Sequence, residues 1–163
     1  MNNVRKAVRK GFSLIELVIV VVIIGIIAAI AIPKMSRGAA GAGDSALKGD
    51  LAVMRQALEQ YAAEHGGAYP TVANMPAALT GYTNSSGTTG AQGTAGFIYG
   101  PYLKAVPPLP VGAATEKGLS TMSATVASGN AWIFTEDSTS TYVIDVHANA
   151  TTTDVNGTVY NTY

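Results

Sequence analysis

The sequence predicts an α+β protein in which one long N-terminal helix packs on a small antiparallel β-sheet. Three observations predict this fold class. Residues 12–32 are almost entirely apolar, residues 44–64 repeat apolar side chains at helical spacing, and the last third of the chain holds short segments rich in β-branched and aromatic residues. Helices and strands that occupy separate parts of a chain are typical of α+β folds.

The apolar run of residues 12–32 is long enough to span a membrane. At 1.5 Å per residue it would form a helix of about 31 Å, which matches the thickness of a bilayer core. Basic residues alone carry charge ahead of it, namely Arg5, Lys6, Arg9 and Lys10. The positive-inside rule therefore predicts a cytoplasmic N-terminus for the precursor and places the rest of the chain across the membrane.

One carboxylate, Glu16, lies inside this apolar run. A charge at membrane depth costs a few kcal/mol or more, so it needs a partner and usually marks function. A cut between Gly11 and Phe12 would create such a partner, because the new α-amine could reach a Glu16 carboxylate on a packed neighbour.

Two other interpretations of the N-terminus stay open. Ala29-Ile30-Ala31 could be the cleavage site of an ordinary secretory signal, and the run could be the uncut anchor of a single-pass protein. The run is longer than a typical signal core of about 7–15 residues, and a discarded signal gains nothing from a charge such as Glu16. Both features argue against the secretory signal.

The motif Gly11-Phe12-Ser13-Leu14-Ile15-Glu16-Leu17 resembles the class III signal of type IV prepilins and type II secretion pseudopilins. Pro33 also lies where that family commonly has a proline. The resemblance implies that a prepilin peptidase cuts after Gly11 and N-methylates Phe12. It further implies a helical filament of many copies, in which Glu16 pairs with the Phe12 amine of an adjacent subunit.

The same resemblance implies partners and a location. An assembly ATPase, an inner-membrane platform protein and minor pilins or pseudopilins would take part in assembly. The precursor would lie in the bacterial inner membrane, and the filament would be periplasmic or extracellular. The head resembles pseudopilins more loosely, because Gly67-Ala68-Tyr69-Pro70 looks like their common turn. Residues 100–107, followed later by Gly129-Asn130-Ala131-Trp132-Ile133, look like the head of G-type major pseudopilins.

These features predict a leader of residues 1–11, a helix over 12–65 whose part 12–32 is the membrane span and fibre core, and a head over 66–163. Within the helix, Gly25 and Pro33 are expected to be points of flexibility, since glycine and proline both weaken helices.

The second half of the helix is predicted from one apolar stripe. Its members recur every three or four residues: Leu47, Leu51, Met54, Leu58 and Tyr61. Asp44 is a possible cap or restart after a Gly/Ala-rich stretch, and His65-Gly66-Gly67 is a typical helix stop. The stripe requires a covering layer, which the head would supply.

The head is predicted to be β-sheet and loop. The best strands are 131–134 and 141–146, which we expect to form a hairpin through 136–140. Residues 119–126 and 158–160 are further candidate strands. Two segments are predicted to be irregular, the polar residues 80–96 and the proline-rich residues 106–111.

Composition excludes several functions. The chain has no cysteine, so no disulfide can stabilise the head. After the leader it carries six basic and ten acidic residues, a balance that does not favour nucleic-acid binding. No catalytic set, metal site or cofactor motif is recognisable. The two histidines, His65 and His147, are expected to be ordinary surface residues.

Three aspartates, Asp137, Asp145 and Asp154, are expected to be solvated loop acids rather than calcium ligands. The sequence thus predicts a structural filament subunit that is not an enzyme. The alternative is a membrane-anchored binding module, an adhesin or receptor, that does not polymerise.

Overall fold

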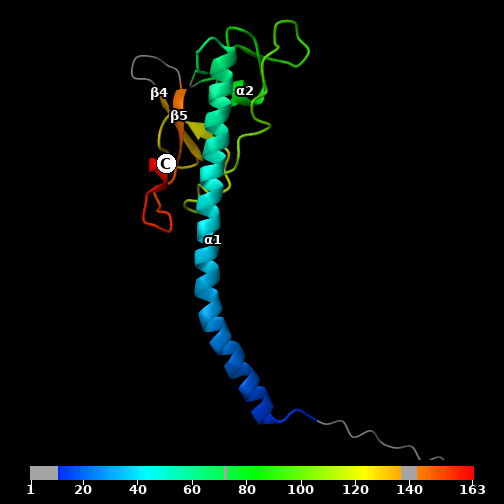
Figure 1. Ribbon diagram of the computed structural model, residues 1–163, viewed down its shortest axis with the longest axis vertical. Coiled ribbons are helices and arrows are strands. Elements are labelled where there is room, and N and C mark those ends of the chain that lie inside the picture. Colours follow the sequence, from blue (N-terminus) through cyan, green and yellow to red (C-terminus); the bar gives the residue numbers. More distant parts are fainter. Residues whose placement is uncertain (1–10, 72, 137–142) are drawn as a thin grey trace, which may run out of the picture. The chain divides into compact units, whose positions relative to one another are not determined.

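The computed structural model describes residues 11–71, 73–136 and 143–163 (Figure 1). The chain divides into two compact units, Met1–Gly38 and Ala39–Tyr163. Helix α1, Leu14–Glu64, contributes its first part to one unit and its second part to the other. By length and composition, it is the one helix among the described residues that could cross a membrane.

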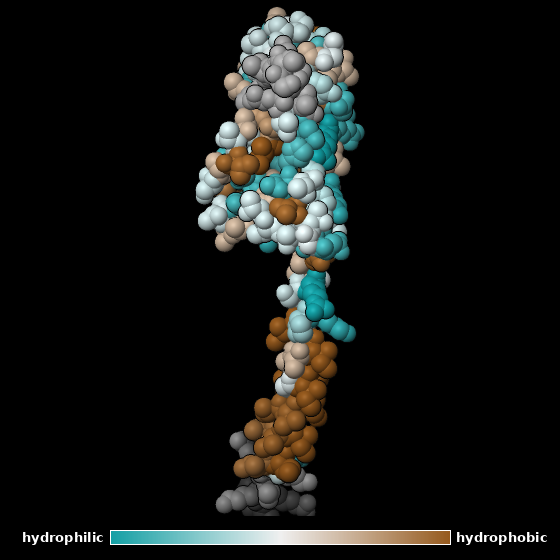
Figure 2. Space-filling model, turned by 90° about the vertical axis from the view of Figure 1, so that its left-hand side faces the viewer, coloured by the Kyte–Doolittle hydropathy of each residue, from teal (hydrophilic) through white to brown (hydrophobic). Residues whose placement is uncertain are grey.

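The first unit is an apolar helix that leaves its side chains uncovered. Figure 2 shows apolar surface over the visible face of this segment, and Phe12 at its start is 88% exposed. Many of its residues are β-branched, which lowers helix propensity slightly in water. In lipid the helix is favoured regardless, because every backbone N–H and C=O must find a partner inside the segment.

The second unit is built on the remaining part of α1. The predicted stripe from Leu47 to Tyr61 is buried, with no member more than 3% exposed. The helix also continues without a break through Asp44, which is itself buried. Asp44 is therefore not a cap or a restart, and the glycines before it do not interrupt the helix.

A three-stranded sheet covers the stripe, formed by β3 (Met122–Ser123), β4 (Trp132–Glu136) and β5 (Val143–Ala148). Strands β4 and β5 pair antiparallel, with Trp132 opposite Ala148, as the hairpin prediction requires. The predicted connection lies mostly outside the described residues. Figure 1 shows β4 and β5 beside this part of α1.

The expectation of a wholly antiparallel sheet is wrong, because β3 runs parallel to β4. Met122 pairs with Trp132, so the chain makes a wide loop between them and returns in the same direction. A tight two-residue turn would have forced antiparallel pairing. Within the candidate strand 119–126, only β3 has strand structure.

The region predicted as a polar loop contains local structure. Helix α2 (Met75–Thr80) precedes a small antiparallel pair, β1 (Tyr82–Thr83) with β2 (Thr89–Gly90). The turn between these strands is held by the side chain of Asn84, whose Oδ1 accepts the backbone N–H groups of Ser86 and Thr88. Such Asx turns explain why polar residues can order this segment.

The predicted edge strand over residues 158–160 does not form. Val159 makes one isolated bridge to Thr153, and the chain then enters a 3₁₀ helix, η1 (Tyr160–Thr162). The buried core of the second unit draws on α1, α2, the proline-rich arm, β4, β5 and η1. Its largest fully buried side chains are Leu47, Leu51, Met54, Leu58, Pro70, Met75, Leu79, Thr83, Leu109, Trp132 and Val146.

Candidate functional site

The predicted processing and assembly residues gather at the start of α1. Ser13 precedes the first helical residue and accepts a bond from the backbone N–H of Leu17 at 3.2 Å, so it is the N-cap. The carboxylate of Glu16 reaches back, and its Oε2 accepts the backbone N–H of Ser13 at 2.8 Å. This is one half of a capping box, which satisfies a backbone donor that a helix start leaves free.

Glu16 is thereby fixed at a defined place on the helix. Its negative charge lies in the first turn, where the helix dipole favours anions. Only Oε2 is engaged within the described residues. The second carboxylate oxygen accepts no hydrogen bond within these residues.

The two predicted points of flexibility lie inside α1. The helix is continuous through Gly25 and Pro33. Proline has no N–H to donate, so one backbone bond of the ladder is missing there. No atom outside the helix lies within 4 Å of the position that a Cβ on Gly25 would take. Their flexibility remains a prediction.

In the second unit, a polar contact ties α1 to the C-terminal segment. Asp44, 6% exposed, accepts a 2.5 Å hydrogen bond from the Tyr160 hydroxyl and a 3.1 Å bond from the backbone N–H of Val155. Burial, together with the adjacent Asp44 carboxylate, raises the pKa of Tyr160. Asp44 is thus a buried and fully partnered acid.

Arg55 makes a second tie between the same elements. Its Nε donates to Asp145 Oδ1 at 2.7 Å, and its Nη2 donates to the backbone oxygens of Val146 and Tyr163 at 3.0 and 2.9 Å. His147 also contacts this group, with Nδ1 2.9 Å from the Tyr163 oxygen. Asp145 is therefore an ion-paired strand residue and not the solvated loop acid that we expected. His147 is hydrogen-bonded to the C-terminal residue and is not an ordinary surface histidine.

Asp154 is likewise not a solvated loop acid. Its side chain accepts hydrogen bonds from the Tyr163 hydroxyl and from the backbone N–H groups of Asn156 and Thr158. The Tyr163 bond, followed by the backbone bonds, lowers the pKa of Asp154 from 3.8 to about 2. Both carboxylate oxygens of Asp154 therefore already accept hydrogen bonds from the protein itself. Asp137 lies outside the described residues.

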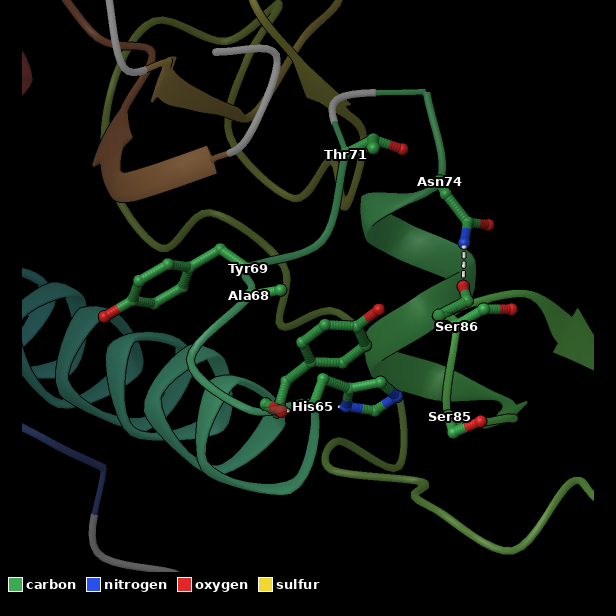
Figure 3. Close-up of a pocket in the computed structure, with 9 residues that line it drawn as sticks. His65, Ala68, Tyr69, Thr71, Asn74, Ser85 and Ser86 are labelled. Carbon is green, nitrogen blue, oxygen red and sulfur yellow. Dashed lines mark hydrogen bonds between the residues drawn. The ribbon is translucent and has the colours of Figure 1, made fainter. Parts of the chain in front are cut away.

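A polar cavity of about 210 Å³ opens at the other end of this unit. It lies between the end of α1, the connection through Tyr69 and Thr71, and the turn containing Ser85 and Ser86 (Figure 3). Asn74 closes one side, donating to the backbone oxygen of Gly87 at 2.8 Å.

His65 lines this cavity and is not an ordinary surface histidine. Its ring stacks on Tyr61 at 3.9 Å, and its nitrogens lie within 3.1 Å of the Tyr61 and Asn84 carbonyls and the Thr83 hydroxyl. Both nitrogens therefore already have partners. The other titratable side chains among the described lining residues are the phenols of Tyr61 and Tyr69, and no carboxylate or ammonium group lines the cavity.

Among the described residues, no three His, Asp or Glu side chains are grouped so that they could hold a metal ion. The contacts that the sequence reasoning missed come from Arg55, Tyr160 and Tyr163, and from Lys48, whose ammonium lies 4.8 Å from the centre of the Tyr163 ring. One feature of the sequence pointed to two of these residues, Lys48 and Arg55. Asp44, Lys48 and Arg55 are four and seven positions apart, which places them near one helical face.

The comparisons with known proteins concern the N-terminal segment. Residues 6–32 match the family model of the prokaryotic N-terminal methylation motif. This segment therefore carries the class III prepilin signal of type IV pilins and pseudopilins. Neither the comparison with curated proteins nor that with solved structures found a match to the chain.

The match and the fold together define a class of protein. The long N-terminal apolar helix and the small sheets of the second unit form an α+β, pilin-like architecture. The motif implies processing by a prepilin peptidase and assembly into filaments in general, and with the apolar helix it fits a membrane-anchored precursor.

Proposed function

We propose that this chain is the precursor of a structural subunit of a filament, either a type IV pilus or a type II secretion pseudopilus. It is cut after Gly11, N-methylated at Phe12 and polymerised through α1. One observation carries the proposal, the Gly11-Phe12 junction placed just ahead of an apolar helix that none of the described residues covers.

The cut must lie ahead of the apolar run, because the mature subunit needs this helix for polymerisation. A signal cut after Ala31 would discard the apolar run, whereas a cut after Gly11 keeps it in the product. While the precursor is in the membrane, lipid solvates this helix. After extraction, burial against other copies is favoured by about 1.5–3 kcal/mol for each large apolar side chain. A repeated head-to-tail contact that does not close gives an open helical fibre.

The capped Glu16 supports a register check. Its Oε2 accepts the backbone N–H of its own Ser13, and its other oxygen accepts no hydrogen bond within the described residues, so that oxygen is available to a cation of a neighbouring copy. The new amine of Phe12 is that cation. The pair forms only when subunits are in register, and buried ion pairs contribute specificity more reliably than stability.

Intact-mass and peptide mass spectrometry of the assembled protein test the processing. We expect a mature chain that begins at Phe12 and carries one added methyl group. An intact Met1, or a start at Ile32, would contradict the proposal in favour of an uncut anchor or an ordinary secretory signal.

The second test is the variant Glu16→Gln, with Ser13→Ala as the matched control. Glutamine can still accept the Ser13 N–H but removes the charge, so processing should continue and filament yield should fall. Ser13→Ala keeps the backbone donor and the charge, so its yield should stay near normal. An unchanged filament yield in Glu16→Gln would refute the pairing mechanism and favour a role of Glu16 in helix capping alone.

A further inference from the structure

Two cations follow the apolar run closely. Lys34 and Arg37 lie three positions apart on α1, so their side chains project from neighbouring places on the helix surface. Both are exposed, and neither has an ion pair or hydrogen bond within the described residues. We call Lys34 and Arg37 the basic pair.

One carboxylate is comparably unpartnered. Asp50, on the α1 part of the second unit, is half-buried, and burial raises its pKa with no opposing contribution from a nearby donor. Every other carboxylate whose side chain the structure describes accepts a hydrogen bond. The donors are Ser13 to Glu16, Tyr160 to Asp44, Tyr69 to Glu59, Tyr102 to Glu64, Ala113 to Glu116, Arg55 to Asp145 and Tyr163 to Asp154.

In the proposed filament, the basic pair would need a counter-ion, and Asp50 is a carboxylate that could supply one. When the apolar helices pack against one another, the basic pair, which begins two residues after Ile32, comes to the edge of a region that loses water. A charge that loses water without a counter-ion is strongly unfavourable. Lys104 and Lys117, by contrast, are exposed in the second unit and can stay hydrated.

The charges of the two units are complementary. Beyond Gly38 the chain carries nine acidic and four basic residues, whereas residues 12–38 carry the basic pair and Glu16. Complementary charges steer encounter and set register between partners. A second copy of the same chain therefore offers the basic pair an acidic surface.

From these observations we propose that the basic pair of one subunit forms an intersubunit ion pair with Asp50 of a second copy. This inference rests on the proposed function. The contact fixes the axial register of neighbouring subunits at a place distinct from Glu16. The groups that both subunits contribute lie on α1.

Proximity can be tested cleanly because the chain has no cysteine. Two differently tagged copies are co-expressed, one with Lys34→Cys or Arg37→Cys and the other with Asp50→Cys, and filaments are treated with a short bis-maleimide. We expect a mixed dimer carrying both tags. The control pair, Lys117→Cys with Asp50→Cys, should give at least about tenfold less mixed dimer, because Lys117 is not the proposed partner of Asp50.

Charge reversal tests the energetic role. Asp50→Lys should reduce filament yield at least about tenfold, and the triple variant with Lys34→Glu and Arg37→Glu should restore much of it. Emission of the buried Trp132 shows whether the second unit is folded in each variant. Lys117→Glu is the control for net charge and should not restore assembly.

The outcomes separate this inference from the proposed function. If methylated, processed filaments form but the mixed dimer is absent and Asp50→Lys assembles normally, the ion pair is refuted and the filament proposal stands. If the unaltered chain is never cut at Gly11 or never polymerises, the proposed function itself fails. If the basic pair instead alters binding to vesicles of anionic lipid without any mixed dimer, its partner is the membrane and the inference is overturned.

Discussion

The contact between Asp44 and Tyr160 gives the sharpest prediction for stability. In Tyr160→Phe the ring is kept and only the hydroxyl is lost, so little packing changes. Asp44 keeps its bond from Val155 but loses the 2.5 Å bond while remaining 6% exposed. Hydrogen bonds to charged groups contribute about 1.5–3 kcal/mol, so we expect the free energy of unfolding to fall by about 2 kcal/mol.

The assay is urea unfolding of the full chain in nonionic micelles, followed by fluorescence. Trp132 is the one tryptophan of the chain and is fully buried, so its emission reports on the second unit. With a urea dependence of about 2 kcal/mol per molar, the midpoint should fall by about 1 M. Tyr82→Phe is the matched control, because its hydroxyl makes no hydrogen bond within the described residues.

A double-mutant cycle with Asp44→Asn decides whether the two groups act on each other. Residues in contact show coupling, so the double variant should lose clearly less than the two single losses combined. Strict additivity, or a midpoint in Tyr160→Phe equal to that of the unaltered protein, would refute the reasoning and mean that solvent satisfies Asp44.

Two further predictions concern the same unit. Because the pKa of Asp154 is lowered from 3.8 to about 2, its contribution is present above pH 3.8 and lost as pH falls through 2. Thermal melts should show the unaltered protein more stable than Asp154→Asn near pH 5, with the difference shrinking toward pH 2; a constant difference would contradict this. Leu47→Ala should cost about 2–5 kcal/mol, since Leu47 is fully buried, whereas Val53→Ala, at a residue 52% exposed, should cost much less. Equal losses in urea unfolding would contradict the assigned buried face.

Repeating patterns were the part of the fold that could be predicted from the sequence. The spacing of Leu47 to Tyr61 predicts the buried face of α1 because an α-helix returns to the same side every 3.6 residues. The strands around Trp132 and Val146 were predictable from their composition, since β-branched and aromatic runs suit a sheet that is covered on one side. The N-terminal signal is also local, and its match to residues 6–32 needs no tertiary structure.

Polar residues were harder to interpret, because their partners are remote in the chain. Asp44 is bonded to a residue 116 positions away, and Arg55 reaches an aspartate 90 positions away. A single sequence does not show which distant donor meets which acceptor, so Asp44 resembled a cap and Asp154 a solvated acid. The parallel pairing of β3 with β4 depends in the same way on the path of a long loop.

The sequence by itself therefore determined the long helix, its apolar and amphipathic parts, the prepilin signal and the α+β class, because each is written in contiguous residues with a fixed period or spacing. Tertiary structure alone decided which charges are satisfied. It joined Asp44, Arg55 and Asp154 to the C-terminal segment, and left Lys34, Arg37 and Asp50 without partners among the described residues. The physical reason is that a side chain's electrostatic surroundings are set by contacts in space.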